Sequence, residues 1–143
     1  METRLSSHGA YRHLYHLVWI PKYRHKVLVR GVETYVERQL SLIAGLRPDV
    51  EVVSYNVRPD HVHLIMVIPP KYAVSKIAGE IKADPGREIR EKFEWIRGKY
   101  RNDVFWSPGF FSSTVGIDEE SVRKYVEFQE KVDRGNYQLK LGF

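Results

Sequence analysis

Apolar residues along the chain form two patterns, and the first, a continuous run, predicts strands. Runs of apolar and β-branched residues cover positions 14–20, which end before Pro21, and positions 50–57. A third run, 60–68, is almost continuously apolar and is stopped by Pro69. Such a run predicts a strand with both faces covered, and therefore a central strand of its sheet.

The connection between the second and third strands is short, because Arg58, Pro59 and Asp60 lead directly into the histidine strand. A turn of that length predicts an antiparallel hairpin. A further short strand, reaching Val115, is expected after the turn-rich segment 106–111. Residues 1–9 show neither pattern and are expected to form a loose tail.

The second pattern, in which apolar residues lie three to four positions apart, predicts helices. It occurs over 32–43 and over 74–81. Asp84 followed by Pro85 is typical of an N-cap and a first helical residue, so another helix is expected from there to Phe93.

The last predicted helix begins at the N-cap Asp118 and ends near Asp133. Successive residues of a helix turn by about 100°, which brings its apolar positions onto one stripe opposite the charged ones. We expect the stripe to comprise Val122, Val126, Phe128 and Val132. Tyr125 and Gln129 lie within the same stripe, one turn apart.

Length and composition restrict the class of protein. A chain of 143 residues with 43% apolar and 29% charged residues is typical of one soluble globular domain, here residues 1–143. Because the chain has no cysteine, disulfides, thiolate zinc sites and cysteine nucleophiles are excluded, and a reducing cytoplasm is the expected location. Neither a secretory signal nor an apolar run of the roughly 20 residues that span a bilayer is apparent.

The charge balance favours a nucleic-acid partner. The chain carries 23 Lys and Arg against 18 Asp and Glu, and 13% of its residues are aromatic. Basic and aromatic side chains together suit a surface that follows a phosphate backbone and stacks unpaired bases. The clearest basic cluster is residues 22–26, with an aromatic ring inside it; it is either a solvated loop or a phosphate contact beside a stacking ring.

Two histidines in the third strand suggest metal chemistry. Side chains alternate along a strand, so His61 and His63 project from the same face, roughly 7 Å apart. Two imidazoles at that spacing can hold one divalent ion; the alternative is a pair of hydrogen-bonded core histidines. Gln129 poses a similar choice, because a buried amide needs partners. Either it hydrogen-bonds the backbone, or its oxygen binds the same ion.

A six-coordinate ion such as Mg²⁺ or Mn²⁺, held by two imidazoles and an amide oxygen, keeps open positions for a phosphate oxygen. Tyr125 lies one helical turn from Gln129 and is then placed to attack the phosphorus. Its phenol has an ordinary pKa of about 10 and needs help with deprotonation, which no residue of the sequence visibly supplies.

Five segments along nearly the whole chain resemble the HUH single-tyrosine transposases, the TnpA type of insertion sequences that move as single-stranded DNA. They are Tyr15-His16-Leu17-Val18-Trp19 with Lys22-Tyr23-Arg24, Asp60-His61-Val62-His63-Leu64, Ile81-Lys82, Trp106-Ser107-Pro108-Gly109-Phe110-Phe111, and Tyr125-Val126-Glu127-Phe128-Gln129. The His-hydrophobe-His element is weak alone but specific together with the tyrosine and glutamine at the end of the chain.

The resemblance implies an α+β fold, with an antiparallel sheet of about four to five strands (ferredoxin-like) flanked by helices, the last one carrying the tyrosine. It implies that His61, His63 and Gln129 bind the metal and that Tyr125 is the nucleophile. The implied substrate is a DNA hairpin at an element end, cut by a homodimer with shared active sites to leave a 5′-phosphotyrosine. We expect DNA contacts from Lys22, Tyr23, Arg24, Lys26, Lys82, Arg87 and Arg90.

Two other functions stay open. One is a domesticated relative with the same cleavage chemistry that acts on repeated palindromes. The other is a non-catalytic module that binds single-stranded nucleic acid, which would leave the histidine pair and Gln129 without a role. A two-histidine phosphodiesterase would need a second His-x-Ser/Thr motif, and the sequence has none.

Overall fold

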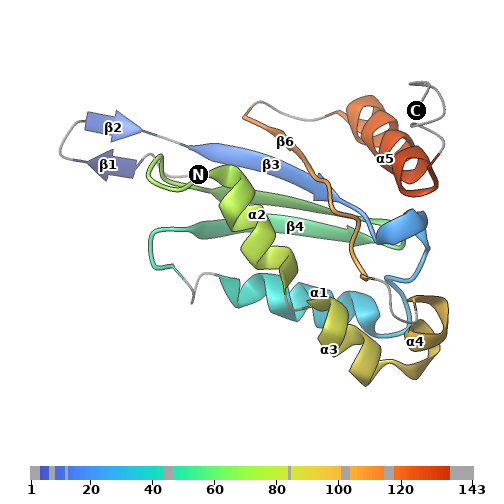
Figure 1. The fold of residues 1–143 in the computed structure, drawn as a ribbon. Coiled ribbons are helices and arrows are strands. Elements are labelled where there is room, and N and C mark those ends of the chain that lie inside the picture. The colour runs from blue at the N-terminus through green and yellow to red at the C-terminus, as the bar shows by residue number, and fades with distance from the viewer. Residues whose placement is uncertain are drawn as a thin grey trace.

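A four-stranded antiparallel sheet forms the centre of the computed structural model, which describes residues 4–6, 9–11, 13–43, 47–83, 85–100, 104–114 and 118–135. The strand order is β4–β5–β3–β6 (Figure 1). The strands are β3 (Leu14–Trp19), β4 (Glu51–Arg58), β5 (His61–Val67) and β6 (Phe111–Ser113). The α+β fold class expected from the sequence is therefore confirmed, and β5 is central as predicted.

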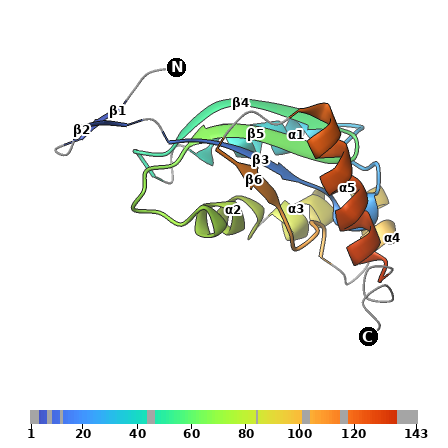
Figure 2. The ribbon, with the colours of Figure 1, turned by 90° about the horizontal axis from the view of Figure 1, so that it is seen from above.

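Helices cover the sheet unequally. Four of them pack on one face, and α5 lies on the other face near β3 and β6 (Figure 2). The helices are η1 (Lys22–Arg24), α1 (Val32–Ser41), α2 (Val74–Ala83), α3 (Pro85–Lys92), α4 (Glu94–Tyr100) and α5 (Glu119–Asp133). None of the helices in the described part of the chain is long and apolar enough to cross a membrane.

The strand alternation sorts side chains between the two faces. Leu17 of β3 lies opposite Leu64 of β5, and both are buried in the large core under α1 to α4. The next pair in register, Val18 and His63, points to the face that carries α5. His61 and His63 are only half-buried there. The prediction that both faces of this strand are covered is therefore wrong for the histidine face, because α5 covers only part of it.

The hairpin between β4 and β5 is antiparallel, with Arg58 paired to His61 and an irregular register between Val52 and Ser54. The strand expected after residues 106–111 is present as β6, but Val115 lies outside the described residues. The helix expected to run to Phe93 ends at Lys92, after which α4 begins at Glu94. Its proposed cap, Asp84, is also outside the described residues.

The loose tail expected for residues 1–9 is wrong where the structure describes it. Strands β1 (Arg4–Ser6) and β2 (Gly9–Tyr11) pair antiparallel in a separate two-stranded sheet beyond the N-terminal start of β3 (Figure 1). Backbone hydrogen bonds form such a ladder without any period of apolar residues. The apolar runs that predict the other strands therefore give no indication of this hairpin.

Helix α5 begins as predicted, because the carboxylate of Asp118 accepts a hydrogen bond from the backbone N–H of Ser121 at 2.7 Å. Its buried residues are Val126 and Gln129, with Val122 and Tyr125 partly buried beside them. Phe128, expected in the apolar stripe, is 46% exposed. Two positions along a helix turn by about 200°, so Phe128 points away when Val126 faces the sheet.

Candidate functional site

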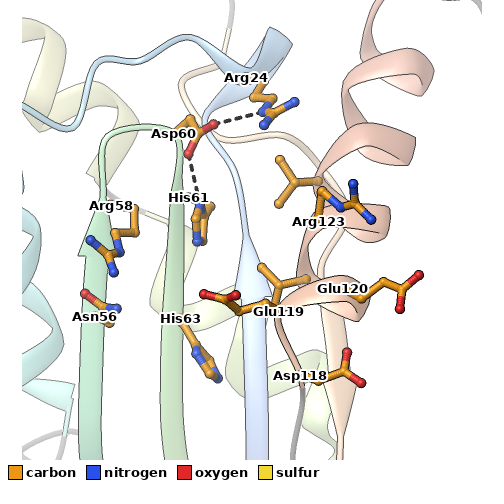
Figure 3. Close-up of a pocket in the computed structure, with 12 residues that line it drawn as sticks. Arg24, Asn56, Arg58, Asp60, His61, His63, Asp118, Glu119, Glu120 and Arg123 are labelled. Carbon is orange, nitrogen blue, oxygen red and sulfur yellow. Dashed lines mark hydrogen bonds and ion pairs between the residues drawn. The ribbon is translucent and has the colours of Figure 1, made fainter.

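The histidine face of β5 and the N-terminal half of α5 enclose an open cleft of about 970 Å³. The sheet contributes polar side chains, and α5 contributes its acidic first turn together with two valines (Figure 3). Its lining includes Arg24, Asp60, His61, His63, Val122 and Val126. His61 and His63 project into this cleft from the same strand, which matches the expected same-face geometry.

His63 has a nitrogen available for a ligand. Its Nε2 atom is buried and has no hydrogen-bond partner among the described residues. Burial lowers the pKa of His63, and electrostatic interactions with His16 and His61 lower it further. The ring is therefore neutral at physiological pH, which is the state that binds metals. The ring of His16 lies 5.7 Å from that of His63, centre to centre.

His61 is held by a carboxylate that sequence reasoning did not single out. Its Nδ1 atom lies 2.9 Å from Oδ1 of Asp60, and the other oxygen of Asp60 accepts a hydrogen bond from Nε of Arg24 at 2.9 Å (Figure 3). Burial would raise the pKa of Asp60, but its hydrogen bonds with His61 and Arg24 and the positive charge of Arg24 lower it overall. A carboxylate directly before the first histidine is the sequence signal that could have pointed to it.

Arg24 also reaches the C-terminal half of α5. Its Nη1 atom donates to Oε1 of Glu130 at 3.2 Å, and Glu130 in turn pairs with Arg134. Arg24 and the preceding Tyr23 both have left-handed backbones, with φ of 56° and 63°. The expected role of Arg24 as a phosphate contact stays a prediction, but in this structure its guanidinium is engaged by two carboxylates.

Tyr125 does not line the cleft. Its ring packs against Phe111 of β6, with the ring centres 5.7 Å apart, on the far side of the two valines of α5. Its hydroxyl is buried without a hydrogen-bond partner among the described residues. Burial, and to a lesser extent the negative charge of Asp133, raises the pKa of Tyr125 above its ordinary value. In this arrangement the phenol is protonated and shielded from solvent.

Gln129 lies on the same side of α5 as Tyr125. Its Nε2 atom donates to Oδ1 of Asp133 at 3.2 Å, and its side chain fills the space beside Gly109. The sequence left two partners open for this amide, the backbone or a metal ion. Its hydrogen bond in the structure goes to a third, the side-chain carboxylate one turn along the same helix.

The turn that receives Gln129 is held by Lys82. Its Nζ atom donates to the backbone oxygens of Ser107 at 2.7 Å and Gly109 at 2.9 Å, while the hydroxyl of Ser107 donates to Asp133 at 3.0 Å. Burial lowers the pKa of Lys82 to about 8, despite the opposing effect of Asp133. This lysine, expected to contact DNA, is directed inward.

The remaining expected DNA contacts have varied surroundings. Lys26 is exposed, and the ammonium of Lys22 lies 5.2 Å from the ring centre of Tyr23. Arg90, in α3, is half-buried, and its backbone oxygen accepts a hydrogen bond from Arg97. The side chain of Arg87 lies outside what the structure describes. None of these geometries tests DNA binding, so these contacts stay predictions.

The two histidines fit a divalent ion, whereas the complete expected ligand set is not gathered in one chain. His63 offers an unpartnered Nε2, and the contact of His61 with Asp60 leaves its own Nε2 for a ligand. Gln129 is turned toward Asp133 and Gly109. No group of three or more His, Cys, Asp or Glu side chains within the described ranges is positioned to hold a metal ion.

Comparison with known sequences gives a consistent family. The family model described as "Transposase IS200 like" matches residues 9–129. Transposases of insertion sequence IS200 from Salmonella typhimurium and Salmonella typhi are each 29% identical over 142 residues, covering 96% of this chain and 90% of theirs. The ISDra2 transposase TnpA of Deinococcus radiodurans is 32% identical over 130 residues, covering 90% of this chain and 92% of its own.

A solved structure agrees with these sequences. A chain from Deinococcus radiodurans R1, assigned as a transposase, superposes with a TM-score of 0.75 at 26% identity. The superposition covers 88% of this chain and 97% of the other. The similarity therefore extends over most of both chains.

Proposed function

Because this chain belongs to the IS200-like transposase family, we propose that it cleaves and rejoins single-stranded DNA through a covalent bond to Tyr125. One observation carries the proposal. His61 and His63 share a face of β5, open into a cleft, and keep nitrogen atoms available for a ligand. Family membership makes the chain a DNA-processing transposase, and the histidine pair supports metal-dependent chemistry in it.

In the proposed reaction the phenolic oxygen of Tyr125 attacks a backbone phosphorus. The new bond joins tyrosine to the 5′-phosphate as the bond to the 3′-oxygen breaks, so the products are a 5′-phosphotyrosine and a free 3′-hydroxyl. Because a phosphodiester replaces a phosphodiester, a second 3′-hydroxyl can reverse the step and join a different strand. Mg²⁺ or Mn²⁺, held by His61, His63 and Gln129, would stabilise negative charge on the scissile phosphate.

The positions of Tyr125 and Gln129 support an active site shared between two chains. Both side chains lie on the β6 side of α5, whereas His61 and His63 open into the cleft on the other side of the two valines. One chain in this arrangement does not bring the nucleophile to the histidines. A homodimer that places α5 of one copy over the histidine face of the other would assemble all four residues.

A free sheet edge is available for such a partner. Strand β4 lies at one end of the sheet and pairs only with β5 among the described strands. Val53 and Tyr55 on this strand are 42% and 38% exposed. A strand with one unpaired edge and exposed apolar side chains can pair with a second copy of the same chain, directly beside the strand that bears the histidines.

The proposed substrate is a hairpin at the end of an insertion sequence, in single-stranded DNA. The basic balance of the chain, the exposed Lys26 and the Tyr23 ring, which the ammonium of Lys22 approaches, support phosphate contact and base stacking. Lys22, Arg24, Arg87 and Arg90 are further proposed contacts. Lys82, also expected to contact DNA, is directed inward and holds the turn beside Gln129.

The test is a covalent-adduct assay. End-labelled single strands carrying the element ends are incubated with the protein and Mg²⁺ or Mn²⁺, and the products are separated under denaturing conditions. We expect a labelled protein band that forms only with the metal, and digestion followed by mass spectrometry should locate the nucleotide on Tyr125. An adduct on another tyrosine, or cleavage without an adduct, would contradict the proposal.

A further inference from the structure

Asp60 bridges two functional parts of the molecule with its two carboxylate oxygens. Oδ1 lies 2.9 Å from Nδ1 of His61, and Oδ2 lies 2.9 Å from Nε of Arg24 (Figure 3). The side chain of Asp60 is only 14% exposed. A partly buried carboxylate with one strong partner on each oxygen has little freedom to rotate.

The contact with Asp60 selects one form of the neutral His61 ring. An ionised carboxylate only accepts hydrogen bonds, so Nδ1 must carry the proton and Nε2 must carry the lone pair. A lone pair on Nε2 is what a divalent ion requires of a histidine ligand, and a carboxylate behind the ring fixes its orientation as well. In the metal-free protein, Nε2 therefore already has its lone pair and its orientation fixed for binding a metal.

Arg24 in turn depends on α5. The turn formed by Tyr23 and Arg24 has two consecutive left-handed residues, a backbone that side-chain-bearing residues rarely adopt. Three contacts from α5 and its C-cap hold it: Asp133 accepts from the backbone N–H of Tyr23, Arg134 donates to the backbone oxygen of Tyr23, and Glu130 accepts from Arg24. The helix that carries Tyr125 therefore supports the guanidinium that restrains Asp60.

We infer that Asp60 and Arg24 are positioning residues for His61, and that Glu130 makes this positioning depend on the docking of α5. The path runs from Glu130 through Arg24 and Asp60 to the ring of His61, and each step is a direct contact. The inference deepens the proposed function and rests on it, since it assigns His61 to the metal. It adds that the nucleophile's helix and a metal ligand are physically coupled within one chain.

The first test reads the tautomer of His61 in the full-length, metal-free protein. Long-range ¹H–¹⁵N correlation spectra distinguish a protonated Nδ1 from a protonated Nε2, and a His61→Asn variant identifies the signals of that ring among the six histidines. At pH 8 we expect His61 in the Nδ1–H form. In Asp60→Asn we expect a mixture of the two forms. An Nε2–H ring in the unmodified protein, or an unchanged ring in Asp60→Asn, would overturn the inference.

The second test measures Mn²⁺ affinity by calorimetry, with the metal alone as the probe. We expect Asp60→Asn to weaken binding by about 10-fold to 100-fold, as outer carboxylates of metal-bound histidines usually do. Arg24→Gln and Glu130→Gln should weaken it less, because they act through Asp60. Glu127→Gln is the matched control, since Glu127 lies on the same helix and is exposed. Thermal melts of each variant show whether the fold is kept.

The outcomes separate this inference from the proposed function. Tight Mn²⁺ binding that Asp60→Asn leaves unchanged would overturn the positioning role and leave the proposed metal site intact. Equal effects of Glu130→Gln and Glu127→Gln would overturn the link to α5. If no Mn²⁺ binds but the tautomer depends on Asp60, the positioning of His61 stands and the metal-dependent function fails.

Discussion

The side chain of Gln129 occupies the space in which a Cβ atom of residue 109 would lie, so Gly109 is the residue that admits it. The contact joins α5 to the turn before β6. Lys82 holds the same turn by donating hydrogen bonds to two of its backbone oxygens. Gln129 keeps its hydrogen bond to Asp133 only while this space stays free. Glycine is required here because Gln129 leaves no space for a Cβ atom, and the sequence around residue 109 does not reveal this requirement.

Gly109→Ala should lower the free energy of unfolding by about 1–2 kcal/mol, because the added methyl group displaces the buried amide of Gln129 from its hydrogen bond. Denaturant titration measures the change. Gly98→Ala is the control, since a Cβ there meets nothing within 4 Å and the residue is helical; it should raise stability by up to about 1 kcal/mol. In a Gln129→Ala background, Gly109→Ala should cost less. Equal costs in both backgrounds would show that the two residues do not interact.

Tyr125→Phe should abolish both DNA cleavage and the covalent adduct, while hairpin binding stays within a few-fold of the unmodified protein. The substitution removes only a hydroxyl that has no hydrogen-bond partner among the described residues, so the packing against Phe111 is kept. The loss of a buried, unpartnered hydroxyl should also leave stability unchanged or slightly raised. An adduct that forms at normal yield in this variant would assign the nucleophile to another tyrosine, such as Tyr137.

His61→Ala, His63→Ala and Gln129→Ala should each weaken metal-dependent cleavage, the histidine changes more strongly. Imidazole nitrogen is the stronger ligand for Mn²⁺, and an amide oxygen contributes less. Calorimetric titration with Mn²⁺ in the absence of DNA is the measurement. Because Gln129 is engaged by Asp133 in the single chain, its variant should change Mn²⁺ affinity least. Unchanged affinity in both histidine variants would mean that the pair is structural.

A mixed dimer of His61→Ala and Tyr125→Phe chains should recover cleavage that neither variant shows alone. If each site takes its histidines from one chain and its tyrosine from the other, one of the two sites collects both lesions and the second is intact. The two chains carry different affinity tags, so that only mixed dimers are assayed. A mixed dimer of verified composition that never cleaves would exclude the shared site in the cleaving state.

Binding to single-stranded hairpins should weaken steeply with salt, because phosphate contacts release counterions. The log–log slope should be about 0.7 per contact on a single strand. Lys26→Gln should reduce the slope by about that amount, since Lys26 is exposed in the basic cluster. Lys131→Gln, an exposed lysine on α5 outside the expected contacts, serves as the control. A flat salt response in the unmodified protein would argue against the basic cluster as the DNA-binding surface.

Local patterns in the sequence were sufficient for the elements that position the site. The runs of apolar residues predicted the central histidine strand and its hairpin partner, and both are present as β5 and β4. The cap at Asp118 predicted the start of α5 to the residue. These features depend on residues that are close in the sequence, because the hydrogen bonds and side-chain directions that form them involve one helical turn or one pair of adjacent strands.

Only the tertiary structure decided which faces of these elements meet. The link from His61 through Asp60 and Arg24 to Glu130 joins residues up to 106 positions apart, and no local period encodes it. Lys82 was expected to face DNA, yet it turns inward because the backbone oxygens of Ser107 and Gly109 lie within its reach. Tyr125 and the two histidines were singled out from the sequence. That α5 presents its valines to the cleft and its tyrosine to β6 follows from how the helix docks on the sheet, a choice made by packing between distant segments.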